Sequence, residues 1–159
     1  MARLIFNRFD IFLTLSAFKM KKMKTTISCN WVEGMAFESQ IGKHKIIMDV
    51  DEKAGGSDSG PRPKPLMLSA LAGCSGMDVV SIIKKMRVEI SSFRMEVEGE
   101  LTEEHPKYYK TIHIIYIFKA PEEALDQLKK AVELSLDKYC GVSAQLKLGV
   151  PVTHSVILE

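Results

Sequence analysis

Hydrophobic and polar residues alternate with a period of two soon after the start of the chain. Three such segments, residues 25–34, 35–42 and 43–52, are separated by Gly34 and Gly42. Alternation of this kind is typical of half-buried strands, and glycine between two strands favours a tight turn. We therefore predict an antiparallel meander with one buried face.

The pattern changes in the middle of the chain. Residues Ala54–Pro63 are rich in Gly, Ser and Pro, which predicts a flexible loop leading into a helix, with a lid as the alternative role. From Leu66 to about Met86 the sequence is apolar on all sides in its first half, so we expect a buried helix rather than an amphipathic one. Asp78 near its middle argues against a transmembrane span.

The last part of the chain returns to strand patterns. Residues 92–101 and 110–120 read as two strands, Pro121 opens a helix that runs to about Lys138, and residues 150–158 read as a final strand. The resulting order βββ–α–ββ–α–β predicts an α+β fold in which helices cover sheets.

Length and charge narrow the class of protein. A chain of 159 residues with 46% hydrophobic and 26% charged residues suits one domain with a sizeable core. Residues 1–22 carry five basic residues and one acidic residue, so the net charge of +2 leaves residues 23–159 weakly acidic. Such a body gives no support for nucleic-acid binding.

Residues 1–22 do not read as part of the core domain, which we expect to span residues 23–159. Arg8 and Asp10 interrupt the first half of the segment, and lysines follow its apolar half, so it resembles neither an export signal nor a membrane span. Translation of upstream sequence is one explanation for this leader, and a short membrane-surface helix is the other. We expect a cytoplasmic protein without a membrane partner.

Three cysteines, Cys29, Cys74 and Cys140, are too few for a disulfide framework and include no CxxC pair. A structural zinc site would need a fourth ligand from scattered histidines, and no spacing resembles a finger or a ribbon. A small buried hydrophobic side chain is the default explanation for a cysteine, and it suffices for Cys29.

The other two cysteines lie in less ordinary settings. Cys74 is flanked by Gly73 and Gly76 inside a predicted helix, where each glycine costs roughly 1 kcal/mol relative to alanine. Close packing by another segment or access to the sulfur would explain them. Cys140 lies just past the end of a predicted helix and could meet the central helix, as an attacking and resolving cysteine pair requires. Core packing is the alternative for both.

Two segments carry a resemblance to a known family. GPRPKPLMLSALAGCSGMDVVSIIKKM (residues 60–86) and AVELSLDKYCGVS (residues 131–143) resemble the OsmC/Ohr family of osmotically inducible and organic hydroperoxide resistance proteins, and the resemblance extends from about Met23 to Leu158. It implies an α+β fold with antiparallel sheets packed around a buried central helix that carries a cysteine, in an intertwined homodimer.

The resemblance also implies a chemistry. Cys74 would attack an organic hydroperoxide and Cys140 would resolve the product to a disulfide. The substrate would be a small hydrophobic or peroxide molecule, and a lipoyl-type external dithiol would act as reductant. No bound cofactor, metal, haem or flavin would be needed.

The sequence departs from the family pattern near the predicted thiolate. The family has Pro-Glu-x-Leu where this chain has Pro63-Lys64-Pro65-Leu66, and the arginine expected in the first strand loop is absent from residues 31–35. Arg62 and Lys64 are the candidate replacement cations, with a solvated loop as the alternative. Asp78 shares a helix face with Cys74 and would disfavour its thiolate unless a cation intervenes; a structural hydrogen bond is its other explanation.

Two functions from different classes therefore remain as hypotheses. The first is a thiol-dependent peroxidase or redox enzyme that uses Cys74 and Cys140. The second is a non-enzymatic small-ligand-binding or redox-sensing protein that retains the same fold. The ionisation state of Cys74 at neutral pH distinguishes them. A zinc-binding module is a third, weaker hypothesis, which would require metal retained after purification.

Overall fold

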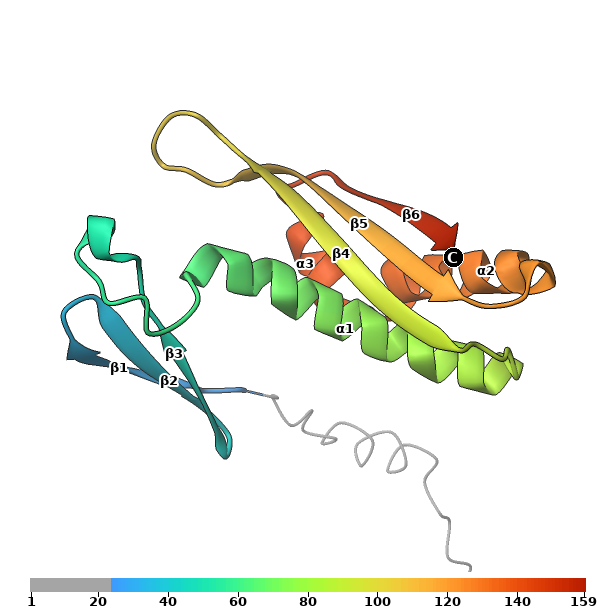
Figure 1. Ribbon diagram of the computed structural model, residues 1–159, viewed down its shortest axis with the longest axis horizontal. Helices are drawn as coiled ribbons and strands as arrows, with labels where there is room; N and C mark the ends of the chain where they lie inside the picture. Colours follow the sequence, from blue (N-terminus) through green and yellow to red (C-terminus); the bar gives the residue numbers. More distant parts are fainter. Residues whose placement is uncertain (1–23) are drawn as a thin grey trace, which may run out of the picture.

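The computed structural model describes residues 24–159, so the predicted leader, residues 1–22, lies outside the described residues. Two three-stranded sheets are connected by one long helix, α1, and further helices cover the second sheet (Figure 1). The element order agrees with the predicted α+β fold, with one additional short helix near the C-terminus.

The N-terminal sheet is the predicted antiparallel meander. It consists of β1 (Ser28–Glu33), β2 (Ala36–Ile41) and β3 (His44–Met48). Gly34 and Gly42 form its two turns with positive φ angles of 50° and 59°, a backbone conformation that favours glycine. The predicted buried face is thin, because only Ala36 and Ser39 of these strands are buried within the chain.

The Gly- and Ser-rich segment after β3 is held in place rather than being a flexible loop. It contains a short 3-10 turn, η1 (Glu52–Ala54), and folds back over the buried Asp49. The Asp49 carboxylate accepts hydrogen bonds from the backbone N–H groups of Val50, Ser57 and Ser59 and from both serine hydroxyls. These donors hold the pKa of Asp49 far below its usual range.

Helix α1 spans Pro63–Met86, three residues longer at its start than predicted. Only one stripe of it is buried within the chain, Leu71, Ser75, Val79 and Ile83, so the predicted burial on all sides is not met in a single chain. Among residues 24–159 it is the one helix long and apolar enough to cross a membrane, a property it shares with core helices of soluble proteins.

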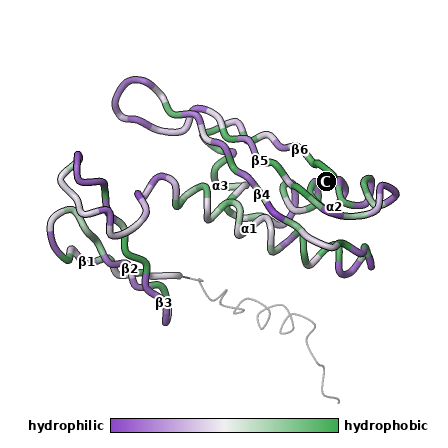
Figure 2. The backbone as a smooth tube through the Cα atoms, viewed as in Figure 1, coloured by the Kyte–Doolittle hydropathy of each residue, from purple (hydrophilic) through white to green (hydrophobic). Residues whose placement is uncertain are grey.

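The second sheet covers the buried stripe of α1. It is built from β4 (Ser92–Leu101), β5 (Tyr109–Lys119) and β6 (Val152–Leu158), with β5 in the centre. β4 and β5 pair antiparallel, whereas β5 and β6 pair parallel. Figure 2 shows hydrophobic positions along α1 and β5 and a hydrophilic loop between β4 and β5.

The parallel pairing of β5 with β6 requires a crossover, and the remaining helices provide it. A 3-10 turn, η2 (Glu122–Ala124), leads into α2 (Leu125–Leu134), a single π-helical turn, η3 (Ser135–Tyr139), and α3 (Gly141–Leu146). The sequence predicted the first part as one helix and did not predict α3. Leu128, Ala131 and Val132 of α2 are completely buried against α1 and the sheet.

Candidate active site: a cysteine pair beside a carboxylate

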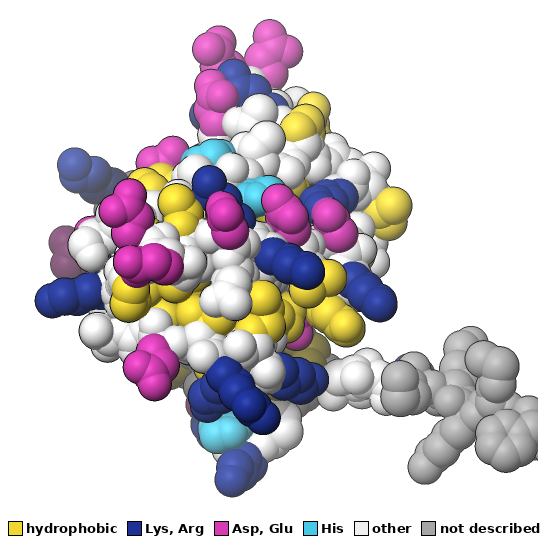
Figure 3. Space-filling model, turned by 90° about the vertical axis from the view of Figure 1, so that its right-hand side faces the viewer, with side chains coloured by type: hydrophobic (Ala, Val, Ile, Leu, Met, Phe, Trp, Pro, Cys, Tyr) yellow, Lys and Arg dark blue, Asp and Glu magenta, His cyan; other side chains and the backbone are white. Residues whose placement is uncertain are grey.

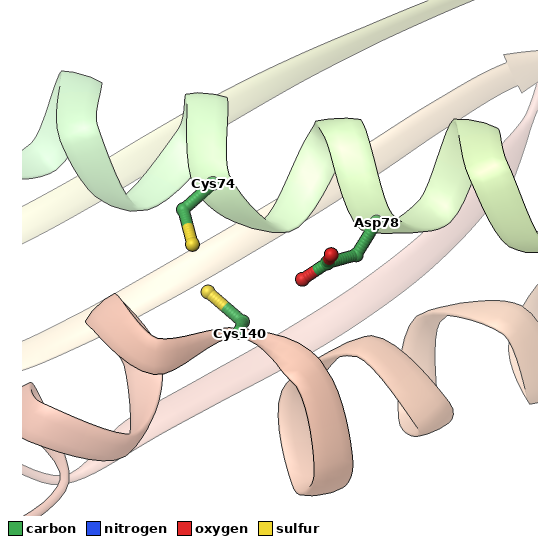
Figure 4. Close-up of side chains that lie close together, drawn as sticks. All are labelled: Cys74, Asp78 and Cys140. Carbon is green, nitrogen blue, oxygen red and sulfur yellow. The ribbon is translucent and has the colours of Figure 1, made fainter. Parts of the chain in front are cut away.

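The structure brings Cys74 and Cys140 together. Cys74 lies in the middle of α1, and Cys140 lies between η3 and α3, on the segment that packs against α1 (Figure 4). The two sulfur atoms and a carboxylate oxygen of Asp78 all lie within 4.8 Å of one another, and both cysteines are free thiols. The two residues that the sequence singled out therefore meet at one site.

The π-helical turn positions Cys140. The Cys140 backbone N–H donates to the Ser135 carbonyl at 2.8 Å, which closes the turn, and the Ser143 N–H donates to the Cys140 sulfur at 3.3 Å at the start of α3. π-helical turns inside helices recur at functional sites because they re-aim a side chain. Here the wide turn directs the sulfur of Cys140 toward α1.

Burial sets the ionisation of Cys140, which is 2% exposed. Desolvation raises the pKa of its thiol to about 11; the neighbouring Cys74 and Asp78 act in the same direction, and the Ser143 N–H opposes them. Cys140 is therefore a protonated thiol at neutral pH. That state suits a residue that reacts second, after another sulfur has been oxidised.

A buried polar anchor next to the cysteines joins three elements. The Ser75 hydroxyl is hydrogen-bonded to the Tyr116 hydroxyl of β5 and, at 3.0 Å, to the Ser135 hydroxyl of η3. Ser135 also hydrogen-bonds the Ser75 carbonyl at 3.2 Å. Because Ser75 follows Cys74 directly and Ser135 carries the turn before Cys140, this anchor fixes the distance between the two sulfurs. Sequence reasoning missed it, since its members are far apart in the chain.

The two glycines beside Cys74 have different explanations. A Cβ atom on Gly76 would lie 3.0 Å from the Met95 sulfur, so Gly76 permits close packing of β4 on α1. A Cβ atom on Gly73 would meet nothing within 4 Å in the chain, so Gly73 leaves open space beside Cys74. Packing, one of the two explanations that the sequence suggested, therefore applies to Gly76, whereas access to the sulfur stays a prediction for Gly73.

Asp78 has an unusual environment for a carboxylate. Its Oδ2 atom is inaccessible to solvent and has no hydrogen-bond partner among residues 24–159. The structural hydrogen bond that the sequence favoured for this residue is therefore not present at that oxygen. The carboxylate instead points toward the two sulfurs, one helical turn after Cys74 (Figure 4).

Arg62 and Lys64 do not approach the cysteines within one chain. Both lie at the start of α1, about 18 Å and 15 Å along the helix axis from Cys74 at 1.5 Å per residue. Arg62 forms an ion pair with Asp51, and the Lys64 ammonium donates to the Lys107 carbonyl at 3.2 Å. Their role as replacement cations stays a prediction.

Two hollows lie near the cysteine pair in the sequence and along α1. A hollow of about 270 Å³ lies between α1 and α3, lined by Met67, Ala70, Gly141, Val142, Gln145 and Leu146. Ala70 lies one turn before Cys74, and Gly141 follows Cys140 directly. A second hollow, of about 450 Å³, opens on the other side, where Asp78 and Tyr139 are among its lining residues.

The structure also shows the surroundings of Cys29 and His113. Cys29 is exposed in β1, so the expectation that it is a small buried hydrophobic side chain is wrong within the single chain. His113 of β5 hydrogen-bonds the Thr153 and Ser155 hydroxyls of β6 at 2.7 Å and 3.1 Å, so both of its ring nitrogens have partners within the sheet.

The fold agrees with what comparison with known proteins finds. Residues 56–155 match the sequence profile of the OsmC-like protein family, and the chain belongs to that family. Protein YhfA of Escherichia coli K12 is 36% identical over 127 residues, which cover 79% of this chain and 91% of YhfA.

Solved structures share the fold. A hypothetical protein from Aquifex aeolicus VF5 is 30% identical, with a TM-score of 0.70 over 86% of this chain and 98% of that one. The organic hydroperoxide resistance protein OhrB of Bacillus subtilis is 15% identical, with a TM-score of 0.62 over 84% of this chain and 98% of its own. At that identity the likeness concerns the fold alone.

Proposed function

We propose that this protein is a thiol-dependent peroxidase that reduces organic hydroperoxides through Cys74 and Cys140. The observation that carries the proposal is the approach of the two sulfurs to within 4.8 Å, with Cys74 half-buried and Cys140 buried. Membership of a family whose structural relatives include organic hydroperoxide resistance proteins supports the same reading.

The chemistry proceeds in two steps. The Cys74 thiolate attacks the distal oxygen of the peroxide, the O–O bond breaks, and the alcohol leaves after taking up a proton, so that Cys74 becomes a sulfenic acid. The Cys140 sulfur then displaces the hydroxyl group, which leaves as water with the thiol proton, and a Cys74–Cys140 disulfide forms. An external lipoyl-type dithiol returns two electrons and restores both thiols; no bound cofactor takes part.

The surroundings of the pair favour an apolar substrate. The hollow between α1 and α3 exposes mainly aliphatic surface from Met67, Val142 and Leu146 beside the cysteines. Apolar walls bind the organic part of a hydroperoxide and give hydrogen peroxide nothing to contact. We therefore propose that an alkyl or aryl hydroperoxide reacts faster than hydrogen peroxide.

We further propose that the protein acts as a homodimer in the cytoplasm. The side of α1 that faces away from its own sheet includes Met67 and Met77, which are 45% and 72% exposed in the single chain. The N-terminal sheet also leaves apolar side chains uncovered, and Figure 3 shows a band of hydrophobic side chains on one end of the molecule. Surface of this kind is the mark of an interface between copies.

The test is a stopped-flow reaction of the reduced protein with cumene hydroperoxide and with hydrogen peroxide, following thiol loss and intact mass. We expect fast loss of two thiols per chain in the wild type and in the matched control Cys29→Ser. Cys74→Ser abolishes the fast reaction, and Cys140→Ser stops at one added oxygen. Thiol loss at the rate of an ordinary free thiol, equal in all variants, would refute the catalytic reading.

One observation favours the second candidate function, a redox sensor or small-ligand-binding protein. The group that the structure places beside the two sulfurs is the Asp78 carboxylate, and its negative charge does not assist attack of a sulfur on peroxide. A sensor tolerates slow oxidation, whereas an enzyme does not. Slow but complete Cys74–Cys140 disulfide formation, without turnover by a dithiol, would select this function.

A further inference from the structure

The cluster of Cys74, Asp78 and Cys140 contains a carboxylate in addition to its two sulfurs. Three potential ligand atoms, two sulfurs and one carboxylate oxygen, lie within 4.8 Å of one another. They come from two segments far apart in the chain, with Cys74 and Asp78 on one face of α1 and Cys140 opposite them (Figure 4). The thiol chemistry proposed above uses the sulfurs and leaves Asp78 without a task.

Asp78 needs a positive partner that the chain does not give it. A buried carboxylate oxygen without a donor or a cation is costly, and Asp78 Oδ2 has neither a hydrogen bond nor an ion pair among residues 24–159. Lys85 and Lys130 line the same hollow as Asp78 but form no ion pair with it within that range. The cluster is therefore rich in ligands and poor in positive charge.

The donor set and its spacing suit one kind of ion. Two thiolates and a carboxylate are ligands of Zn²⁺ and of similar thiophilic divalent cations, at about 2.3 Å from sulfur and roughly 2.0–2.2 Å from oxygen. Ligand atoms around one tetrahedral ion are then about 3.6–3.8 Å apart. From separations of up to 4.8 Å the cluster has to contract by only about 1 Å, which side-chain rotation can supply.

We propose that the reduced protein binds one Zn²⁺-like cation through the Cys74 and Cys140 sulfurs and the Asp78 carboxylate. Binding releases the two thiol protons, and three protein ligands leave a fourth position for water or a small thiol. The sequence argued against zinc because it offered no fourth ligand, but an open site needs only three.

Metal binding and disulfide formation exclude each other. A metal-bound sulfur has its lone pair engaged and is withheld from a peroxide, whereas a disulfide has lost the two electrons with which the thiolates bind the metal. A disulfide formed by any oxidant of the thiol pair, a hydroperoxide included, therefore expels the ion. Bound metal slows oxidation of the cysteine pair, and oxidation of the metal-free fraction prevents the ion from binding again. This inference does not depend on peroxidase turnover, since it requires only the reduced thiols and Asp78.

The test uses Co²⁺ as a spectroscopic probe and Zn²⁺ in competition with a chromophoric chelator, on the reduced full-length protein without oxygen. We expect one Co²⁺ per chain, with thiolate-to-metal charge-transfer absorption and the strong visible bands of a tetrahedral site. Cys29→Ser retains the spectrum. Cys74→Ser and Cys140→Ser lose the charge-transfer band in proportion to the sulfur removed, and Asp78→Asn weakens Zn²⁺ binding by roughly tenfold or more.

Circular dichroism of the metal-free variants verifies their folding. The wild type, oxidised to the Cys74–Cys140 disulfide, offers a second test without any substitution, and we expect it to bind no Co²⁺. A Co²⁺ spectrum without charge-transfer absorption, or one that Cys74→Ser leaves unchanged, would overturn the metal site. Because the peroxide reaction is measured separately by thiol loss, either proposal can fail while the other stands.

Discussion

The two sheets of this chain use their apolar residues differently. In the second sheet, the inward side chains of β5, among them Ile112, Ile114 and Phe118, are at most 1% exposed beneath α1 and α2. In the N-terminal sheet, Trp31 is 65% exposed and Phe37 is 42% exposed. The second sheet has a core of its own, whereas the first has apolar surface that nothing in the chain covers. The difference indicates that the chain carries one complete core and part of another.

The largest effect is expected inside the complete core. Leu128 of α2 is fully buried, so Leu128→Ala should lower the free energy of unfolding by about 2–5 kcal/mol through lost burial and a residual cavity. Urea unfolding at neutral pH measures it. The matched control is Leu148→Ala, because Leu148 is 81% exposed and should change stability by less than about 0.5 kcal/mol. Equal effects at the two positions would contradict the distinction between a buried core and exposed apolar surface.

The next effect concerns the uncovered sheet. We expect Trp31→Ala to weaken self-association by roughly 2 kcal/mol or more, about 30-fold in the dissociation constant, because exposed tryptophans are typical interface anchors. Sedimentation velocity over a dilution series measures this, with Lys43→Ala in the β2–β3 turn as control. A wild-type protein that stays monomeric at all concentrations would show that the exposed sheet is not an interface.

A smaller effect is expected at the anchor that joins the complete core to the site. Ser75→Ala removes the partner that the structure gives the buried Tyr116 hydroxyl, and should cost about 1–3 kcal/mol in unfolding free energy. Ser81→Ala on the exposed side of the same helix is the control. We also expect slower formation of the Cys74–Cys140 disulfide in Ser75→Ala, as measured by thiol loss, since η3 keeps only the hydrogen bond from Ser135 to the Ser75 carbonyl and loses the one between the two hydroxyls. A disulfide rate equal to that of Ser81→Ala would contradict the positioning role.

A pH-dependent effect is expected at the junction between the two regions, where Asp49 organises residues 50–59. Its pKa is lowered in the folded chain, so its contribution to stability is present above the ordinary value of 3.8 and is lost as the pH falls below it. Asp49→Asn should therefore reduce stability at neutral pH and flatten its decline in acid, measured by urea unfolding across this range. Asp58→Asn, in the same segment and exposed, should follow the wild type.

The sequence predicted those features that depend on local pattern. Alternation and glycine placement predicted the strands of both sheets, and the apolar run around Cys74 predicted α1. The π-helical turn was missed because its residues read as a continuation of the preceding helix, and α3 was missed because Gly141 is typical of a helix end and six residues are too few to show a helical period. The hydrogen bonds that Asp49 accepts from residues 57 and 59, and those between Ser75 and Ser135, were missed because their partners are separated in the sequence. The all-round apolar pattern of α1 was visible in the sequence, whereas the single chain buries only one stripe of the helix.

The parallel pairing of β6 with β5 has a consequence for the order of events during synthesis. Cys140 lies in the crossover that precedes β6, and β6 is the last strand of the chain. A nascent chain presents Cys74 long before the segment that carries Cys140 has emerged and been fastened to the sheet. The Cys74 thiol is therefore without its companion until the crossover has packed against α1 and β6 has docked on β5, so the cysteine pair is assembled late in folding.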